Sequence, residues 1–94
     1  CGGIGSTYNY QMKTISIVYR AVNEGNLLKA KELQGKANEV IRVLFRNGAN
    51  LACEKAIMYL LGFDVGIPRK PMVPFPSERV ESLRDQLNQI GFFL

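Results

Sequence analysis

The glycine-rich beginning of this chain constrains its fold more than any other feature. Residues 1–10 hold too many glycines for a helix, and the alternation of Ile4, Ser6 and Tyr8 predicts a short strand that runs into a loop. No later segment has a strand pattern, so the chain itself offers no neighbour for the ladder hydrogen bonds. Three arrangements remain open: the segment is disordered, it pairs with a second copy, or it belongs to a sheet supplied from elsewhere.

The rest of the chain is predicted to be helical. One helical face is formed by Met12, Ile15, Tyr19 and Val22, which follow its spacing, so we expect Tyr19 to lie in the core. Prolines exclude a helix from 63 to 76. The predicted helices run from about Met12 to Gly25, from Asn26 to Asn47, from Asn50 to Gly62 and from Ser77 to Gly91, with Asn26, Asn50 and Ser77 as N-terminal caps. The predicted fold class is therefore mostly α, with one short strand and then four helices.

The order of these elements suggests a domain division. A strand followed directly by an amphipathic helix is the first half of a βαβ unit. We therefore assign residues 1–25 to a last βα unit, and residues 26–94 to a C-terminal helical extension with a proline-rich linker at 63–76. On this assignment the sequence is the end of something longer.

Composition excludes several classes of function. The chain has no histidine, which removes the Ser-His-Asp and Cys-His triads and histidine-based zinc sites. Cys1 and Cys53 make no disulfide framework, so we expect a reducing, cytoplasmic setting. The longest uncharged apolar run, 56–63, is too short to cross a membrane. The net charge of +4 is spread over all the predicted helices and interleaved with glutamates, so we expect no nucleic-acid partner.

The loop Gly3–Thr7 is the main candidate site. Glycines let a ligand approach the backbone, successive amides can point inward, and Ser6 and Thr7 add hydroxyl donors. A carboxylate or a phosphate would suit such a loop at the end of a strand. The alternative is a tight turn that only joins strand and helix. Tyr8, directly after the loop, is either a phenol in the site or a packing residue.

Other reactive side chains are weaker candidates. Cys53 lies just inside a predicted helix, where a thiol pKa can fall, but a small buried residue is the alternative interpretation. Arg69 and Lys70 lie between prolines and suit either a docked carboxylate or a rigid surface linker. No lysine lies in an apolar strand where burial would adapt it to Schiff-base chemistry. We expect no metal site and no cofactor.

The segment Gly2–Asn9 resembles the G-x-G-S-T-Y-N segment of the N-acetylneuraminate lyases. These enzymes belong to the pyruvate-dependent aldolase superfamily that also contains dihydrodipicolinate synthase. The resemblance covers essentially the whole chain, through Glu24-Gly25-Asn26, Lys55-Ala56-Ile57 and Pro68-Arg69-Lys70-Pro71. The G-S-T-Y-N string is fairly specific for the sialic-acid branch.

The resemblance implies a (β/α)₈ barrel, to which this chain would contribute strand eight, helix eight and a three-helix extension. It implies reversible cleavage of N-acetylneuraminate to N-acetylmannosamine and pyruvate through a lysine Schiff base, in a homo-oligomer that is usually a tetramer. Gly5 and Ser6 match family residues that contact the sugar part of the substrate. The family's catalytic residues lie upstream, so the resemblance assigns no catalytic residue here, and we expect the 94 residues alone to be inactive.

Two alternatives remain open. One is a related pyruvate-dependent aldolase, similar to dihydrodipicolinate synthase, that uses another acceptor. The other is a small helical interaction module that is not an enzyme. If the helices belong on a barrel, the isolated chain exposes apolar stripes, and we expect it to oligomerise or to exchange elements between copies.

Overall fold

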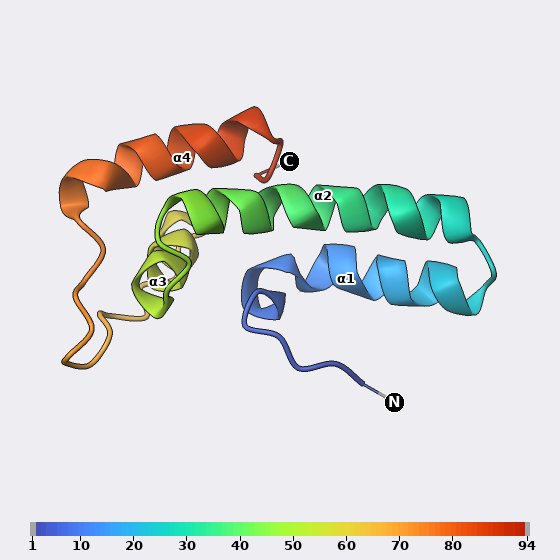
Figure 1. Cartoon of the computed structure of the whole chain (residues 1–94), viewed down its shortest axis with the longest axis horizontal. Coiled ribbons are helices and arrows are strands. Elements are labelled where there is room, and N and C mark those ends of the chain that lie inside the picture. The colour runs from blue at the N-terminus through green and yellow to red at the C-terminus, as the bar shows by residue number, and fades with distance from the viewer. Residues whose placement is uncertain (1, 94) are drawn as a thin grey trace. The chain divides into compact units, whose positions relative to one another are not determined.

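The computed structural model of the protein describes residues 2–93 and is mostly helical, as predicted. Its elements are α1 (Tyr8–Asn23), α2 (Leu27–Arg46), α3 (Leu51–Leu60), the 3₁₀ helix η1 (Ser77–Arg79) and α4 (Val80–Gln89) (Figure 1). None of these helices is long and apolar enough to cross a lipid bilayer. The chain divides into two compact units between Ile41 and Arg42.

Local backbone signals that the sequence predicted set the end of α1 and the beginnings of α2 and α3. Gly25 has a φ of 75°, a left-handed conformation that glycine adopts without steric penalty, and α1 ends just before it. Asn26 then caps α2, because its Oδ1 accepts a hydrogen bond from the Lys29 N–H at 3.2 Å. Asn50 caps α3 in the same way, accepting from the Cys53 N–H at 2.9 Å.

The fourth helix begins differently from the prediction. Ser77 does not act as a cap but is the first residue of η1, and α4 starts only at Val80. Neither η1 nor α4 has a side-chain cap hydrogen bond. The 3₁₀ turn instead leads the chain from the linker into α4, with the Arg79 N–H donating to the Pro76 carbonyl at 3.0 Å. The linker itself, 63–76, contains no helix, as predicted.

The predicted strand is not found among residues 2–93. Residues 2–5 belong to no strand or helix, residues 6 and 7 form a turn, and α1 already begins at Tyr8 rather than near Met12. The physical reason is that a strand requires a neighbouring backbone for its hydrogen bonds, and the described part of the chain supplies none. Cys1, which the predicted strand included, lies outside the described residues.

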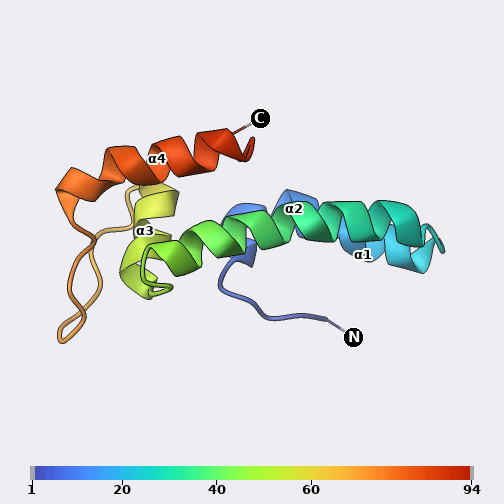
Figure 2. The same cartoon turned by 45° about the horizontal axis from the view of Figure 1, so that its top comes forward.

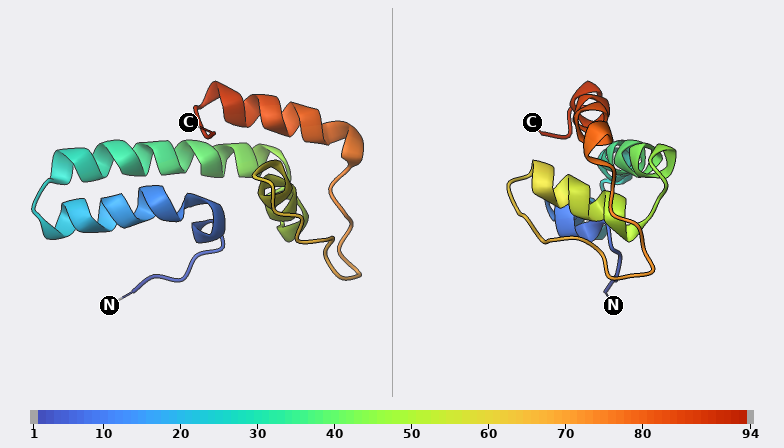
Figure 3. Two further views of the ribbon diagram at one scale, coloured as in Figure 1. Left: turned by 180° about the vertical axis from the view of Figure 1, so that it is seen from behind. Right: turned by 90° about the vertical axis from the view of Figure 1, so that its left-hand side faces the viewer.

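In the first unit, α1 and the beginning of α2 lie side by side and antiparallel (Figures 1 and 3). The buried apolar side chains of this unit are small: Ala21 of α1, and Ala30, Ala37 and Val40 of α2. Short side chains let two helix backbones approach closely. The tight turn at Gly25 brings α2 back along α1, and the Asn26 N–H donates to the Ala21 carbonyl at 2.8 Å to close that turn.

The prediction that Tyr19 lies in the core is wrong. Tyr19 is 60% exposed, and Met12 and Val22 of the same stripe are 53% and 51% exposed. The centre of this stripe is rotated by roughly 140° about the helix axis from buried Ala21. The first unit has no further element to cover it, so α1 presents an apolar face of Met12, Ile15, Tyr19 and Val22.

The second unit buries larger apolar side chains than the first unit does. The fully buried side chains are Val43 from the end of α2, Cys53 and Ile57 from α3, and Leu83 and Leu87 from α4. The helices α3 and α4, which carry Cys53, Ile57, Leu83 and Leu87, are in contact with each other (Figure 2). They supply the hydrophobic stabilisation of this unit.

A buried asparagine connects three elements of the second unit. Asn47 is 4% exposed, and its Nδ2 donates to the Val43 carbonyl at 2.8 Å and to Gln86 Oε1 at 3.0 Å. Its Oδ1 accepts a hydrogen bond from Arg79 Nη2 at 3.0 Å. The guanidinium of Arg79 also lies 5.4 Å from the centre of the Phe75 ring. Asn47 therefore ties the end of α2 to η1 and α4.

We expect the 94-residue chain to self-associate through the apolar face of α1, because exposed apolar surface of this kind drives association. The double substitution Met12→Gln and Tyr19→Gln should lower the average mass measured by sedimentation. Lys13→Gln, at an exposed position of the same helix, is the matched control and should leave the mass unchanged. A monodisperse monomer of the unsubstituted chain at micromolar concentration would contradict this expectation.

Candidate functional site

The predicted site residues lie in the loop that leads into α1. Gly5 is partly exposed, and Ser6 is exposed in the turn just before the helix. The Tyr8 N–H donates to the Gly5 carbonyl at 3.1 Å. The Ser6 carbonyl accepts two hydrogen bonds from Asn9, one from the backbone N–H at 3.3 Å and one from Nδ2 at 2.9 Å. The first two residues of α1 therefore fix the backbone of Gly5 and Ser6.

The Tyr8 ring lies on the side of the loop from which side chains at positions 3 and 5 would project. A Cβ atom added to Gly3 would lie 3.0 Å from Tyr8 Oη, and one added to Gly5 would lie 3.1 Å from Tyr8 Cε1. Neither glycine is among those with a left-handed φ. These glycines therefore leave room for the Tyr8 ring, and a Cβ at either position would require the ring to shift by a few tenths of an ångström. The sequence predicted that a ligand would use this room, but here the chain's own tyrosine occupies it.

The loop also carries hydrogen-bond donors that the fold leaves unused. Within residues 2–93, no carbonyl accepts from the N–H groups of Gly5, Ser6 or Thr7. Thr7 makes no side-chain cap bond, and no hydrogen bond in this part of the chain engages the Ser6 hydroxyl. The N–H groups of Tyr8 and Asn9, by contrast, are already bonded to backbone carbonyls. The unused donors fit a ligand that presents hydroxyl, carbonyl or carboxylate oxygens.

The contribution of Asn9 was not predicted from the sequence. An asparagine can reach back to a carbonyl three residues earlier, and the spacing of Ser6 and Asn9 permits that contact. The same spacing also occurs in ordinary turns, so it identifies no functional residue by itself.

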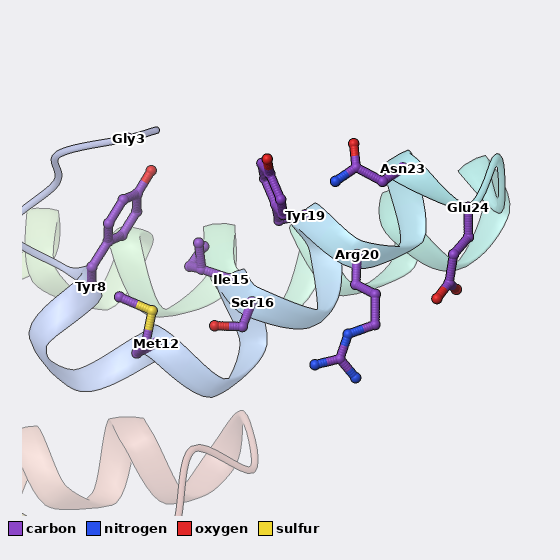
Figure 4. A pocket seen from close by; sticks show the side chains of 9 residues that line it. All are labelled: Gly3, Tyr8, Met12, Ile15, Ser16, Tyr19, Arg20, Asn23 and Glu24. Atoms are coloured by element: carbon purple, nitrogen blue, oxygen red, sulfur yellow. The ribbon is translucent and has the colours of Figure 1, made fainter. Parts of the chain in front are cut away.

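A groove runs along α1 beside this loop. It has a volume of about 600 Å³, and its residues are Gly3, Tyr8, Met12, Ile15, Ser16, Tyr19, Arg20, Asn23 and Glu24. Figure 4 shows Tyr8, Ile15 and Tyr19 projecting from the same side of the helix, with Gly3 beside the hydroxyl end of Tyr8. Gly5 and Ser6 are not part of its lining. The groove therefore follows the apolar face of α1, and the polar donors lie outside it.

The structure offers no Schiff-base lysine among the described residues. Lys55 is partly buried, and its Nζ donates to the Val65 carbonyl at 3.1 Å. The other lysines are exposed: Lys13, Lys29, Lys31, Lys36 and Lys70. A lysine nucleophile requires an environment that favours its neutral form, and exposed ammonium groups lack one. Residues 2–93 also hold no cluster of His, Cys, Asp and Glu suited to a metal ion.

Cys53 is a buried residue and not a reactive one. Its side chain is 0% exposed. Burial raises the pKa of the Cys53 thiol from 9.0 to about 11, the Glu54 carboxylate adds to the rise, and Arg79 opposes it. The neutral thiol packs in the core of the second unit and is a poor nucleophile.

We expect Cys53 to react with iodoacetamide much more slowly in the folded chain than in denaturant at about pH 8, because both burial and the raised pKa suppress the thiolate. Peptide mapping separates its signal from that of Cys1. Since the folded-state pKa is the higher one, the stabilisation from the neutral thiol is present below pH 9.0 and is lost as the pH rises toward about 11. A Cys53→Ala variant should lack this part of the pH dependence. Equal labelling rates in both states would contradict the assignment.

Comparison with known proteins identifies the family. A model of the dihydrodipicolinate synthetase family matches residues 1–90. N-acetylneuraminate lyases of Salmonella agona (strain SL483) and Salmonella newport (strain SL254) are each 32% identical to this chain over 89 residues, or 95% of it. The solved structure of Proteus mirabilis N-acetylneuraminate lyase is similar over 96% of this chain, with a TM-score of 0.83 and 31% sequence identity.

The chain spans 30% of the length of these relatives. The resemblance of Gly2–Asn9 and the later segments to the N-acetylneuraminate lyases and their superfamily is confirmed by both kinds of relative. Because the family model extends over nearly all its residues, this chain belongs to the dihydrodipicolinate synthetase family.

Proposed function

We propose that this chain is the C-terminal part of an aldolase-type lyase that reversibly cleaves N-acetylneuraminate to N-acetylmannosamine and pyruvate. The observation that carries the proposal is the similarity of 95% of the chain to N-acetylneuraminate lyases of two Salmonella strains. On this proposal residues 1–25 form the last βα unit of a (β/α)₈ barrel, and residues 26–94 form the helical extension. The whole enzyme is a cytoplasmic homo-oligomer.

Within the enzyme, we propose that the loop before α1 binds the sugar part of the substrate. The unused N–H groups of Gly5, Ser6 and Thr7 and the Ser6 hydroxyl are donors, and the sugar part of the substrate is rich in acceptor oxygens. Gly5 and Ser6 are the residues that the family resemblance assigns to this contact. The loop contributes binding and orientation, which raise the rate by holding the substrate in a reactive position.

The carbon–carbon cleavage itself requires a lysine that these residues do not supply. A lysine amine that condenses with the ketone of the substrate creates an iminium, which accepts the electron pair of the breaking bond. We place that lysine in the part of the enzyme outside this chain. The 94 residues alone are then inactive, and the reaction needs no separate cofactor.

The test is made on the product of the complete reading frame that contains residues 1–94. The protein is incubated with pyruvate and borohydride, and its intact mass is measured. We expect a protein several times heavier than this chain that carries one reduced pyruvyl group on a lysine outside residues 1–94, because borohydride reduces the imine irreversibly. The 94-residue chain treated in the same way is the control and should gain no mass.

Two results would contradict the proposal. A product of the size of this chain without an adduct would favour a helical interaction module. An adduct together with turnover of another aldehyde acceptor, and none of N-acetylmannosamine, would favour a related aldolase or synthase of the family. A panel of aldehyde acceptors therefore accompanies the mass measurement.

A further inference from the structure

We propose that Tyr8 is a positioning residue that holds the sugar-contacting loop in place, and that Gly3 and Gly5 are glycines because its ring must fit against them. This inference rests on the proposed function, in which Gly5 and Ser6 contact the sugar. The Tyr8 side chain lines the groove along α1 and also lies beside Gly3 and Gly5 of the loop.

The ring lies beside the loop at two separate points. Its hydroxyl end lies next to Gly3, where an added Cβ would be 3.0 Å from Oη and 3.2 Å from Cε2. Its opposite edge lies next to Gly5, where an added Cβ would be 3.1 Å from Cε1 and 3.3 Å from Cδ1. A flat, rigid ring that lies beside both Gly3 and Gly5 restricts the path of the loop between them.

The ring is itself fixed to the helix. Tyr8 is the first residue of α1, and its N–H donates to the carbonyl of Gly5 at 3.1 Å. One residue therefore holds Gly5 by a backbone hydrogen bond and by ring packing. The ring also blocks the side of Gly5 on which a side chain would stand. A substrate then reaches the loop through its N–H groups and the Ser6 hydroxyl, which the fold leaves unused.

The contact with Gly5 is made by ring carbons, and the hydroxyl is near Gly3 only. Phenylalanine at position 8 therefore keeps the packing against Gly5, whereas leucine removes it. This difference separates the positioning role of the ring from any direct role of the phenol. It also predicts that Gly5 and Tyr8 are energetically coupled, because the three atoms nearest to a Cβ added at position 5 all belong to that ring.

The experiment is a double-mutant cycle in the complete protein. Gly5→Ala should raise KM for N-acetylneuraminate by about tenfold, because the ring and the loop must move apart by a few tenths of an ångström and a misplaced binding group is costly. The borohydride-trapped pyruvate adduct should form at the unsubstituted rate. Tyr8→Phe should behave like the unsubstituted protein, and Tyr8→Leu should raise KM. In the Tyr8→Leu background, Gly5→Ala should add less than about threefold, because the collision is gone.

Gly2→Ala is the matched control, since an added Cβ there meets nothing within 4 Å, and it should change neither KM nor adduct formation. An effect of Gly5→Ala that is equally large with the native tyrosine and in the Tyr8→Leu background would overturn the proposal. So would a loss of sugar binding in Tyr8→Phe equal to that in Tyr8→Leu, because the phenol and not the ring would then be responsible.

Amide hydrogen exchange gives a second measurement that does not depend on turnover. Exchange at residues 5–7 should be faster in Tyr8→Leu than in the unsubstituted protein, and unchanged in Tyr8→Phe. Unchanged exchange in Tyr8→Leu would contradict the positioning role. Failure of the proposed function is recognised separately, because the unsubstituted protein would then form no pyruvate adduct, or would form one without turning over N-acetylmannosamine.

Discussion

The candidate site depends on the packing of one aromatic ring against two glycines. The Tyr8 ring takes the space in which side chains at positions 3 and 5 would begin, so the loop can lie directly against the first turn of α1. The hydrogen bonds from Tyr8 and Asn9 to the Gly5 and Ser6 carbonyls add to the same constraint. Within residues 2–93, the fold leaves free a set of N–H and hydroxyl donors on this loop. In the proposed function the loop binds and orients a polar substrate and performs no bond-breaking chemistry.

The exposed apolar face of α1 can be understood from the length of the relatives. A helix with Met12, Tyr19 and Val22 all more than half exposed has not buried the stripe that its sequence provides. The N-acetylneuraminate lyases similar to this chain are much longer, since the chain spans 30% of each. The groove along this face is apolar near Tyr8, Met12 and Ile15, which is the character of a surface for packing. The polar loop beside it has the character of a binding surface.

The sequence predicted the features that depend on neighbouring residues in the chain. The left-handed turn at Gly25 and the caps at Asn26 and Asn50 need only local hydrogen bonds, and the structure has all three. The strand and the burial of Tyr19 depend on partners far away in sequence or outside these residues. Residues 2–93 contain no strand, and Tyr19 is exposed.

The candidate loop was predictable as a loop rich in donors, but its glycines were misinterpreted. Periodicity and composition do not show which way the Tyr8 side chain turns, so they could not show that the ring fills the space beside Gly3 and Gly5. Ser6 and Gly5 themselves came from the family resemblance, and the geometry adds their unused donors.

A crystal structure of the complete protein with N-acetylneuraminate trapped in its site tests the central claim most directly. We expect the Gly5 N–H and the Ser6 hydroxyl to lie about 2.7–3.2 Å from oxygens of the sugar part. The Tyr8 ring should remain against the two glycines, on the side of the loop away from the sugar. A sugar bound in the groove along α1, or one that displaces the Tyr8 ring to contact the glycines, would contradict the account.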